Sequence, residues 1–432
     1  MKSWRDSVAV YADRRILVVL LLGFSSGLPL ALTGSTLAVW LTEDGVSLAA
    51  IGLFAMVGVP YSVKFLWAPL VDRMPLPLLS RCFGRRRGWA LATQGALIAA
   101  LLALGVCDPA ADPWRVAALA LVVAFCSASQ DIVIDAYRVE ILEESQYGAG
   151  AAAVQFGYRA AMLTSGAGAL LLAEAMPWFW VYAAMAGLVG VGVLTILCNR
   201  EPSAPAQVTA PAAGGLAAWT RDAFVGPFAD MLGRHGWTVA VILAFVVLYK
   251  LGDAMAGVMA NPFYIKIGFS KLDIAEISKL YGFIATIAGT AMGGVLVARV
   301  GIARSLLVCG ILQAASNLMF AWQAHVGADR LWLTATIAIE NVSGGMGSAA
   351  FVAYISALCS LAYTGTQYSL LSSLAAIGRT VLAAQGGYVV EAVGWIDFFL
   401  LSTVAALPGL ALLLWMMRRL PPDSTRARAA AD

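Results

Sequence analysis

The first apolar stretch of the chain reads ILVVLLLGFSSGLPLALTGSTLAVW over residues 16–40 and directly follows Arg14 and Arg15. A helix of about 20 apolar residues crosses the hydrocarbon core of a bilayer. Hydrocarbon offers no partner to backbone groups that are not paired within a helix or a closed barrel. The stretch is longer than the apolar region of a signal peptide, which spans roughly 7–15 residues. It is therefore expected to be a retained membrane-spanning helix.

The composition extends this expectation to the whole molecule. Of the 432 residues, 61% are hydrophobic and only 12% are charged, whereas a soluble chain carries roughly 25% charged residues. Too few polar residues remain to cover a surface that faces water, and the abundance of apolar residues excludes intrinsic disorder. The composition therefore predicts a polytopic membrane protein.

Charge, cysteine and histidine content exclude several kinds of site. A net charge of +3, without a basic stretch interleaved with aromatic residues, gives no reason to expect a nucleic-acid partner. The six cysteines are scattered singly, and the two histidines lie at the edges of apolar runs. We therefore expect no metal site and no cofactor. The chain also lacks a G-x-x-x-x-G-K-[ST] motif, which argues against ATP as its energy source.

Twelve apolar runs of spanning length are expected, six before and six after the longest polar stretch. They lie near residues 16–40, 49–70, 88–107, 114–137, 150–173, 177–198, 237–262, 275–298, 303–325, 331–358, 365–391 and 394–417. The polar stretch is rich in Pro, Ala and Gly, which is typical of a flexible linker. We therefore expect an all-α integral membrane protein. Its parts would be a six-helix bundle at 1–199, a cytoplasmic linker at 200–236, and a second bundle with a short tail at 237–432.

The distribution of basic residues predicts the orientation in the membrane. With the N-terminus in the cytoplasm, most of the 28 Lys and Arg residues fall on the cytoplasmic side, as the positive-inside rule requires. Arg115, Lys266, Lys271 and Arg330 fall on the opposite side. Both termini are therefore expected to be cytoplasmic.

Short matches relate the two halves of the chain. Leu70-Val71-Asp72-Arg73 follows the second apolar run, and Leu296-Val297-Ala298-Arg299 follows the eighth. Arg159 and Arg379 also occupy matched positions in the two halves. Two six-helix bundles joined by a linker are typical of the major facilitator superfamily, which the chain resembles. Chance similarity between apolar helices is the alternative explanation.

One loop carries a motif of that superfamily. Asp72 and Arg73, followed after an insertion at 74–83 by Gly84-Arg85-Arg86-Arg87-Gly88, resemble its G-x-x-x-D-R-x-G-R-R cytoplasmic motif. A carboxylate at a helix end that faces an arginine can latch two bundles in one state. We therefore predict that Asp72, Arg73 and Arg85 have a gating role. The alternative for the arginine run is a contribution to membrane orientation alone.

Two carboxylates lie within the fourth apolar run. Asp131 and Asp135 are spaced i, i+4 and therefore share one face of a helix. Two carboxylates this close in a low dielectric do not both ionise readily, and a carboxyl group that holds a proton at membrane depth can serve a proton relay. Asp131 and Asp135 are therefore predicted to couple transport to protons. The alternative for Asp135 is a structural ion pair with Arg138 or Arg159.

Other polar residues at membrane depth are candidates for binding an anionic substrate. An unpaired charge at the centre of a bilayer costs at least about 2.5–3.5 kcal/mol, and arginine suits two-point contact with a carboxylate. The candidates are Arg159, Lys250, Asp253, Glu340, Asn341 and Arg379. The alternative is internal pairing, of Arg159 with Asp131 or Asp135 and of Arg379 with Glu340.

Longer stretches resemble one family within the superfamily. They are GFSSGLPLALT at 23–33, KFLWAPL at 64–70, AFCSASQDIV at 124–133, LYKLGDA at 248–254, Glu340 with Asn341, and Thr366-Gln367-Tyr368. Together they resemble the AmpG-type anhydromuropeptide permeases of Gram-negative inner membranes, over nearly the whole chain. The resemblance implies binding or coupling roles for Gln130, Asp131, Asp135, Arg159, Lys250 and Asp253.

The resemblance also implies a function. Such a permease would import GlcNAc–anhydro-MurNAc, with or without peptide, across the bacterial inner membrane by proton symport for cell-wall recycling. The imported products would set the inducing signal for chromosomal β-lactamase and thereby affect antibiotic resistance. The expected partners are the muropeptide, protons and the lipid bilayer, and the protein is expected to act as a monomer.

Other functions remain open. A carrier for another anionic solute, such as acetyl-CoA, a sugar or a peptide, shares the general pattern. A drug–proton antiporter fits less well, because its cavity would hold few cations. A membrane enzyme would need a nucleophile or a His or metal cluster at membrane depth, so we expect no enzyme activity. A non-transporting sensor built on the same fold is a further alternative.

Overall fold

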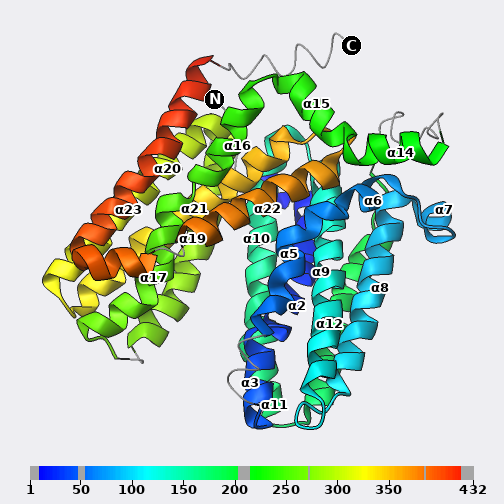
Figure 1. Cartoon of the computed structure of the whole chain (residues 1–432), viewed down its shortest axis with the longest axis horizontal. Coiled ribbons are helices and arrows are strands. Elements are labelled where there is room, and N and C mark those ends of the chain that lie inside the picture. Colours follow the sequence, from blue (N-terminus) through cyan, green and yellow to red (C-terminus); the bar gives the residue numbers. More distant parts are fainter. Residues whose placement is uncertain (1–8, 47–53, 203–214, 271–272, 384–385, 420–432) are drawn as a thin grey trace.

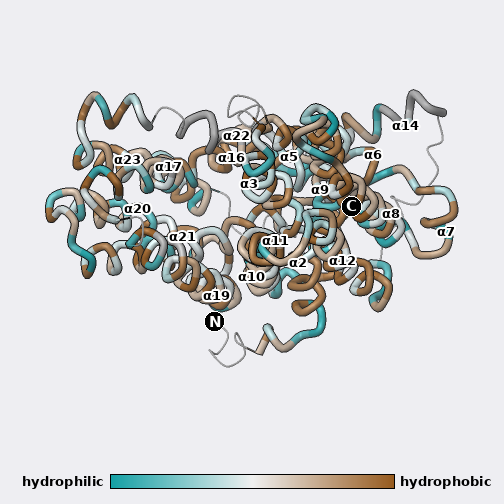
Figure 2. The backbone as a smooth tube through the Cα atoms, turned by 90° about the horizontal axis from the view of Figure 1, so that it is seen from below, coloured by the Kyte–Doolittle hydropathy of each residue, from teal (hydrophilic) through white to brown (hydrophobic). Residues whose placement is uncertain are grey.

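The computed structural model describes residues 9–46, 54–202, 215–270, 273–383 and 386–419 (Figure 1). These residues are overwhelmingly helical, and the described ranges include no strand, which confirms the expected all-α class. Seen from one end, the helices form two groups side by side, and hydrophobic residues run along nearly every helix (Figure 2).

The first group of helices comes from the first half of the chain. Its elements are η1 (Val10–Ala12), α2 (Arg14–Leu32), α3 (Ser35–Glu43), η2 (Phe54–Gly58), α5 (Val59–Val63), η3 (Lys64–Leu66), α6 (Ala68–Arg73), α7 (Leu79–Phe83), α8 (Arg85–Gly105), α9 (Pro113–Ile141), η4 (Glu144–Gln146), α10 (Tyr147–Leu163), the π-helix η5 (Thr164–Gly168), α11 (Ala169–Ala173) and α12 (Trp178–Leu197).

The second group comes from the second half, after two short helices in the polar stretch. The short helices are α14 (Gly215–Phe224) and α15 (Gly226–His235). The second group comprises α16 (Thr238–Leu248), α17 (Leu251–Ile267), the π-helix η6 (Ile274–Tyr281), α19 (Gly282–Val300), α20 (Ile302–Val326), α21 (Arg330–Leu358), α22 (Thr364–Ala383) and α23 (Gly386–Arg419).

Eight helical segments in the described ranges are long and apolar enough to cross a membrane. They are residues 14–43, 85–105, 113–141, 178–197, 238–267, 276–300, 302–326 and 386–419. The other four expected runs are helical where they are described. Two of them are interrupted, because 54–73 forms four short pieces and η5 separates α10 from α11. The other two fall on α21 and α22. Twelve spans and the location of the termini therefore stay predictions.

The helix labelled α23 contains a break at Gly394. This residue has φ 80° and ψ 173°, a backbone conformation that is open essentially to glycine alone. The segments 386–393 and 395–419 are therefore two helices that meet at an angle. The break lies where the sequence separates the expected runs 365–391 and 394–417.

The two groups meet at the end of the molecule that carries α14 and α15, which we call the linker end, and diverge toward the opposite end (Figure 1). At the linker end, the Tyr11 hydroxyl donates to the carbonyl of Ala291 at 3.0 Å. Gly148 at the start of α10 lies against Gly294 and Val297 of α19. These contacts join helices from opposite halves of the chain.

Glycines allow α2 to lie directly against α10. A Cβ added to Gly27 would collide with the backbone of Tyr158, and one added to Gly157 would collide with the backbone of Leu20. Helices in a membrane associate through close packing, because lipid tails are as apolar as the side chains, and small residues permit that packing. Helix α2 also contacts α9, so its polar side chains can reach the fourth predicted run.

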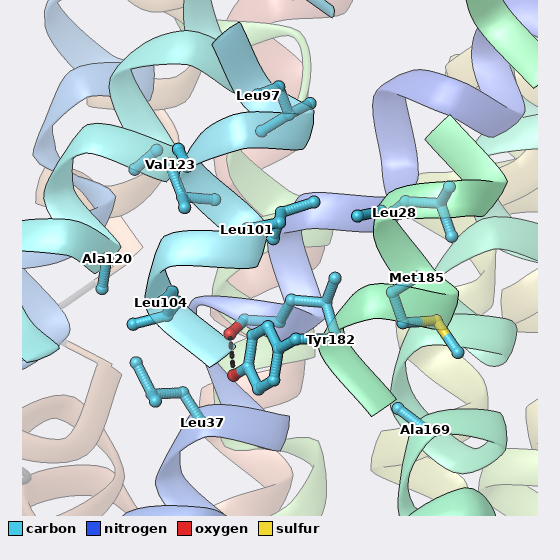
Figure 3. Close-up of a cluster of buried hydrophobic side chains, with 14 of the residues drawn as sticks. Leu28, Leu37, Leu97, Leu101, Leu104, Ala120, Val123, Ala169, Tyr182 and Met185 are labelled. Atoms are coloured by element: carbon cyan, nitrogen blue, oxygen red, sulfur yellow. Dashed lines mark hydrogen bonds between the residues drawn. The ribbon is translucent and has the colours of Figure 1, made fainter. Parts of the chain in front are cut away.

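A buried apolar cluster holds the first group of helices together (Figure 3). Leu97 and Leu101 of α8 pack with Val123 of α9 and with Tyr182 of α12. The Tyr182 hydroxyl donates to the carbonyl of Leu32 at 2.9 Å. Because α2 ends at Leu32, that carbonyl has no partner in the helix, and the tyrosine satisfies it.

Candidate functional site

The predicted gating residue Asp72 joins the two groups of helices. It lies fully buried near the end of α6. Its carboxylate accepts hydrogen bonds from the backbone N–H groups of Gly365 at 3.0 Å and Thr366 at 2.5 Å, and from the Thr366 hydroxyl at 2.6 Å. These N–H groups begin α22, where a helix has unpaired donors and the positive end of its dipole. A carboxylate of the first group thus caps a helix of the second.

Arg86 is the cation that neutralises this carboxylate. One of its terminal nitrogens (Nη2) lies 2.7 Å from Asp72 and 2.5 Å from Glu140, and all three side chains are nearly inaccessible to solvent. Burial alone would raise the pKa of Asp72, but the guanidinium of Arg86 and the hydroxyl of Thr366 hold it below its usual value. Asp72 is therefore a buried carboxylate paired with a buried cation.

Within the described residues, neither of the two arginines that we predicted for gating forms an ion pair with Asp72. Arg73 forms an ion pair with Asp222 of α14 at 2.9 Å and lies 4.6 Å over the ring of Tyr363. The Nη1 atom of Arg85 is buried, and no hydrogen-bond partner for it occurs among the described residues. Of the three arginines in the motif, the structure brings Arg86 to Asp72. The sequence marked the run but did not distinguish its members.

Asp135 lies between two cations. Lys64 Nζ is 3.6 Å from one carboxylate oxygen, and an Arg138 nitrogen is 3.4 Å from the other. Arg138 is fully buried, donates to the Ser356 hydroxyl of α21 at 3.0 Å, and lies 5.0 Å over the ring of Tyr368. The structural pairing with Arg138 that we considered for Asp135 is present. Arg138 also links the first group to the second.

Asp131 has a different environment, although it shares a helix face with Asp135. Its carboxylate accepts a short hydrogen bond from the Ser26 hydroxyl of α2. No cation lies within ion-pair distance of Asp131 in the described part of the chain. The neighbouring Gln130 is fully buried and donates to the Ser25 hydroxyl at 3.1 Å. The fourth run therefore places one hydroxyl-bonded carboxylate one helical turn from one ion-paired carboxylate.

Of the two matched arginines, Arg159 has a described side chain and Arg379 does not. Arg159 lies on α10 and is exposed. No carboxylate within the described ranges forms an ion pair with it, so the pairing with Asp131 or Asp135 does not occur in this structure. Arg379 falls in α22, but its side chain lies outside the described residues, and so does its proposed pairing with Glu340.

A second cluster occupies the other group of helices. Lys250 Nζ lies 3.3 Å from Asp253 and donates to the Ser348 hydroxyl at 3.0 Å. These contacts join the start of α17 to α21. Nearby on α21, the Asn341 amide donates to Glu340 at 2.7 Å and accepts from the Thr286 hydroxyl, also at 2.7 Å. The predicted substrate residues therefore form separate sets, one in each group of helices.

The sequence did not single out several residues that the structure places in these clusters. Ser26 and Arg86 are direct partners of the predicted carboxylates. Gln94 and Gln313 are buried within apolar helices, and their side-chain amides have no hydrogen-bond partner among the described residues. An amide in an apolar run was a visible signal for these two. Ser26 carried no such signal, because hydroxyls are common in membrane helices.

Comparison with known proteins identifies similar chains. The model of the Major Facilitator Superfamily matches residues 19–322. The "Anhydromuropeptide permease" of Escherichia coli (strain K12) is 43% identical over 409 residues, which cover 94% of this chain and 80% of that protein. The "Putative transporter AmpG 4" of Rickettsia conorii is 36% identical, covering 94% of this chain and 97% of that protein.

Solved structures share the fold at much lower identity. A bacterial homologue of the iron transporter ferroportin, in an outward-facing state, superimposes with a TM-score of 0.66 at 14% identity and covers 94% of this chain and 98% of that one. A double-tryptophan XylE mutant gives a TM-score of 0.67 at 13% identity, with 94% and 95% covered. At this identity the likeness extends to the fold alone.

Proposed function

Because this chain belongs to the AmpG-type permeases of the major facilitator superfamily, we propose that it imports anhydromuropeptides from the periplasm to the cytoplasm by proton symport. It is a multi-pass membrane transporter and not an enzyme. The proposal places it in the bacterial inner membrane, as a monomer with cytoplasmic termini and twelve spans. Bundles at 1–199 and 237–432 would rock about the linker at 200–236. Its imported cargo would feed cell-wall recycling and the induction of β-lactamase.

The observation that carries the substrate class is the likeness, over nearly the whole chain, to a protein named anhydromuropeptide permease. The chemistry of the two clusters supports it. A muropeptide brings carboxylates, and Arg159 presents an exposed guanidinium that no described carboxylate neutralises. Lys250 offers a second cation that a substrate carboxylate can draw from Asp253. An anion held between these two residues would contact both bundles.

Asp131 is the proposed proton carrier. It is bonded to a hydroxyl instead of a cation, so protonation would leave no buried cation without its partner. Asp135 is held between Lys64 and Arg138, and protonating it would strand two cations. We therefore assign the transported proton to Asp131 and not to the ion-paired Asp135. We propose that Asp135 serves mainly to position Lys64 and Arg138.

The closed linker end supports a model of alternating access. Asp72 bonded to Thr366, and Arg138 bonded to Ser356, hold the bundles together at the end that the proposal places in the cytoplasm. Release of cargo to the cytoplasm would require both contacts to break. In this model the structure represents the state that accepts cargo from the periplasm.

Uptake by proteoliposomes tests the proposal. Purified protein is reconstituted, and accumulation of radiolabelled GlcNAc–anhydro-MurNAc is followed with and without an inward proton gradient. We expect the gradient to drive accumulation, and Asp131→Asn to abolish the effect of the gradient while exchange of cargo without a gradient persists. Asp112→Asn is the matched control, because Asp112 caps the other end of the same helix and asparagine caps equally well.

Three outcomes would contradict the proposal. Equal accumulation with and without the proton gradient would exclude proton coupling. A gradient effect that persists in Asp131→Asn would exclude Asp131 as the proton carrier. Failure to transport the muropeptide, together with uptake of another anionic solute such as acetyl-CoA, would make the protein a carrier for that solute.

A further inference from the structure

A pocket of about 630 Å³ lies at the linker end of the first group of helices. Its walls come from the start of α2, the end of α9, and the end of α12 with the residues that follow. Three arginines and three carboxylates line it, namely Arg14, Arg15, Arg200, Asp13, Glu140 and Glu201. Neither the predicted substrate residues nor the predicted proton carriers belong to its walls.

The three carboxylates already have donors within the protein. Asp13 accepts from a backbone N–H at the start of α2 at 2.8 Å and from the Gln146 amide at 2.7 Å. Glu140 accepts from Arg86. Glu201 accepts from two backbone N–H groups at the start of α8, at 2.7 and 2.9 Å. Glu140 is therefore bonded to a cation, and the oxygens of Asp13 and Glu201 are already occupied by backbone and amide donors.

The three arginines that line the pocket differ in their partners. Arg15 pairs with the exposed Glu143 at 3.0 Å. Arg14 donates to the carbonyl of Cys198 at 3.1 Å, and both Arg14 and Arg200 are exposed. Within the residues that the structure describes, no carboxylate forms an ion pair with either of them. The pocket thus retains two guanidinium groups for an anion with several oxygens.

Large apolar side chains are exposed next to the pocket. Leu17 follows Arg14 by three residues on the same helix and is 55% exposed; Leu194 precedes Cys198 by four residues and is 63% exposed. Residues three or four apart share one helix face, so each leucine lies one turn from the pocket toward the middle of its helix. In a membrane protein, such exposed leucines contact acyl chains.

We propose that this pocket binds the headgroup of an anionic phospholipid. The phosphate lies between Arg14 and Arg200, and the acyl chains run along Leu17 and Leu194. Arginine presents parallel N–H donors that match the oxygens of a phosphate, and basic pockets between membrane helices suit anionic headgroups. All wall residues lie between positions 13 and 202. The site is therefore formed by the first group of helices and the first residues after α12, and no residue of the second group lines it.

Native mass spectrometry of the purified full-length protein tests the proposal. Phosphatidylglycerol and phosphatidylcholine with identical acyl chains are titrated separately, and glycerol phosphate serves as the soluble form of the same anion. We expect tight binding of phosphatidylglycerol and much weaker binding of the other two. Removing each charge, by Arg14→Gln and Arg200→Gln, should weaken phosphatidylglycerol binding about fivefold, and the double change about 25-fold.

Matched variants distinguish lipid binding at this pocket from a general effect of the protein's net charge. Arg81→Gln with Arg304→Gln removes the same charge from exposed positions elsewhere and should leave binding unchanged. Arg14→Lys with Arg200→Lys keeps both charges but loses the paired N–H donors, so it should lose less affinity than the glutamine pair. The single changes Arg14→Gln and Arg200→Gln test the site if the double change fails to fold. Equal binding of phosphatidylglycerol by wild type and by the variant with Arg14→Gln and Arg200→Gln would overturn the proposal. Equal binding of phosphatidylcholine, or of glycerol phosphate, would also overturn it, the latter by making the ligand a soluble anion.

Discussion

Asp72 accepts a hydrogen bond from the backbone N–H of Thr366, a residue 294 positions later in the chain. The two groups of helices are thus joined by a side chain of one group that caps a helix of the other. A helix start exposes unpaired N–H groups, so separating the groups leaves donors on α22 and a carboxylate on α6 without partners. Water can replace both partners once the end opens. The cap therefore stabilises a closed linker end without preventing it from opening.

Replacing Asp72 by asparagine should loosen the linker end. A hydrogen bond to a charged group contributes roughly 1.5–3 kcal/mol, so the closed state should lose about tenfold to 100-fold in population relative to open states. Cys359, at the end of α21, is partly buried there and can report opening, whereas Cys82 and Cys198 are exposed. We expect faster maleimide labelling of Cys359 in Asp72→Asn, with unchanged labelling of the other two.

Asp112→Asn, at the opposite end of the molecule, should leave Cys359 labelling at the wild-type rate. A wild-type rate in Asp72→Asn as well would mean that the cap does not hold this end closed.

The cap should not respond to pH in the physiological range. Because Arg86 and Thr366 hold the pKa of Asp72 below its usual value despite burial, its stabilising effect is complete above the ordinary carboxyl pKa of about 3.9. That effect is lost only as the pH falls through the lower folded-state value. Spin-label distances across the linker end can be compared between wild type and Asp72→Asn. Their difference should stay constant from pH 5 to pH 8, and a difference that vanishes near pH 5 would refute this assignment.

Arg86 and Arg85 are adjacent, but their loss should have different effects. Arg86 is 1% exposed and pairs with both Asp72 and Glu140. Arg86→Gln leaves two buried carboxylates without a cation, which costs about 3–5 kcal/mol. Arg85 has no ion pair in the described part of the chain, so Arg85→Gln should cost far less. Thermal unfolding in detergent measures both variants.

A second change at Glu140 distinguishes charge imbalance from lost packing. Glu140→Gln added to Arg86→Gln removes one of the two stranded carboxylates and should recover part of the lost stability. No recovery, or equal losses for Arg85→Gln and Arg86→Gln, would contradict the pairing seen here.

The choice between these arginines shows why the sequence could indicate the motif but not its contacts. Helix α8 begins directly after Gly84, whose φ of 91° turns the chain. Glu201, distant in sequence, bonds the first N–H groups of that helix. Both features lie at the start of α8, and from that helix Arg86 reaches Asp72 of α6. Neither the turn nor the cap is visible in the run Arg85-Arg86-Arg87.

The fourth run illustrates what spacing alone can and cannot predict. The i, i+4 spacing correctly indicates that Asp131 and Asp135 share a helix, because a long apolar run can cross a membrane only as a helix or within a barrel. Their partners come from Ser26 and Lys64, on two other segments. Those partners depend on how closely α2 and η3 pack against α9, and that packing depends on glycines and crossing angles along whole helices. Apolar periodicity carries no such information.

Arg159 provides the sharpest test of the proposed substrate site. Its guanidinium is exposed and has no ion pair among the described residues, so Arg159→Gln should leave the unfolding temperature unchanged. If it binds a substrate carboxylate, losing that charged hydrogen bond should raise the KM for peptide-bearing muropeptide about tenfold to 100-fold. Arg138→Gln is the contrasting variant, because Arg138 is buried against Ser356 and Asp135 and its loss should lower the unfolding temperature. An unchanged KM in Arg159→Gln would place the substrate elsewhere, and a fall in its unfolding temperature would make Arg159 a structural residue.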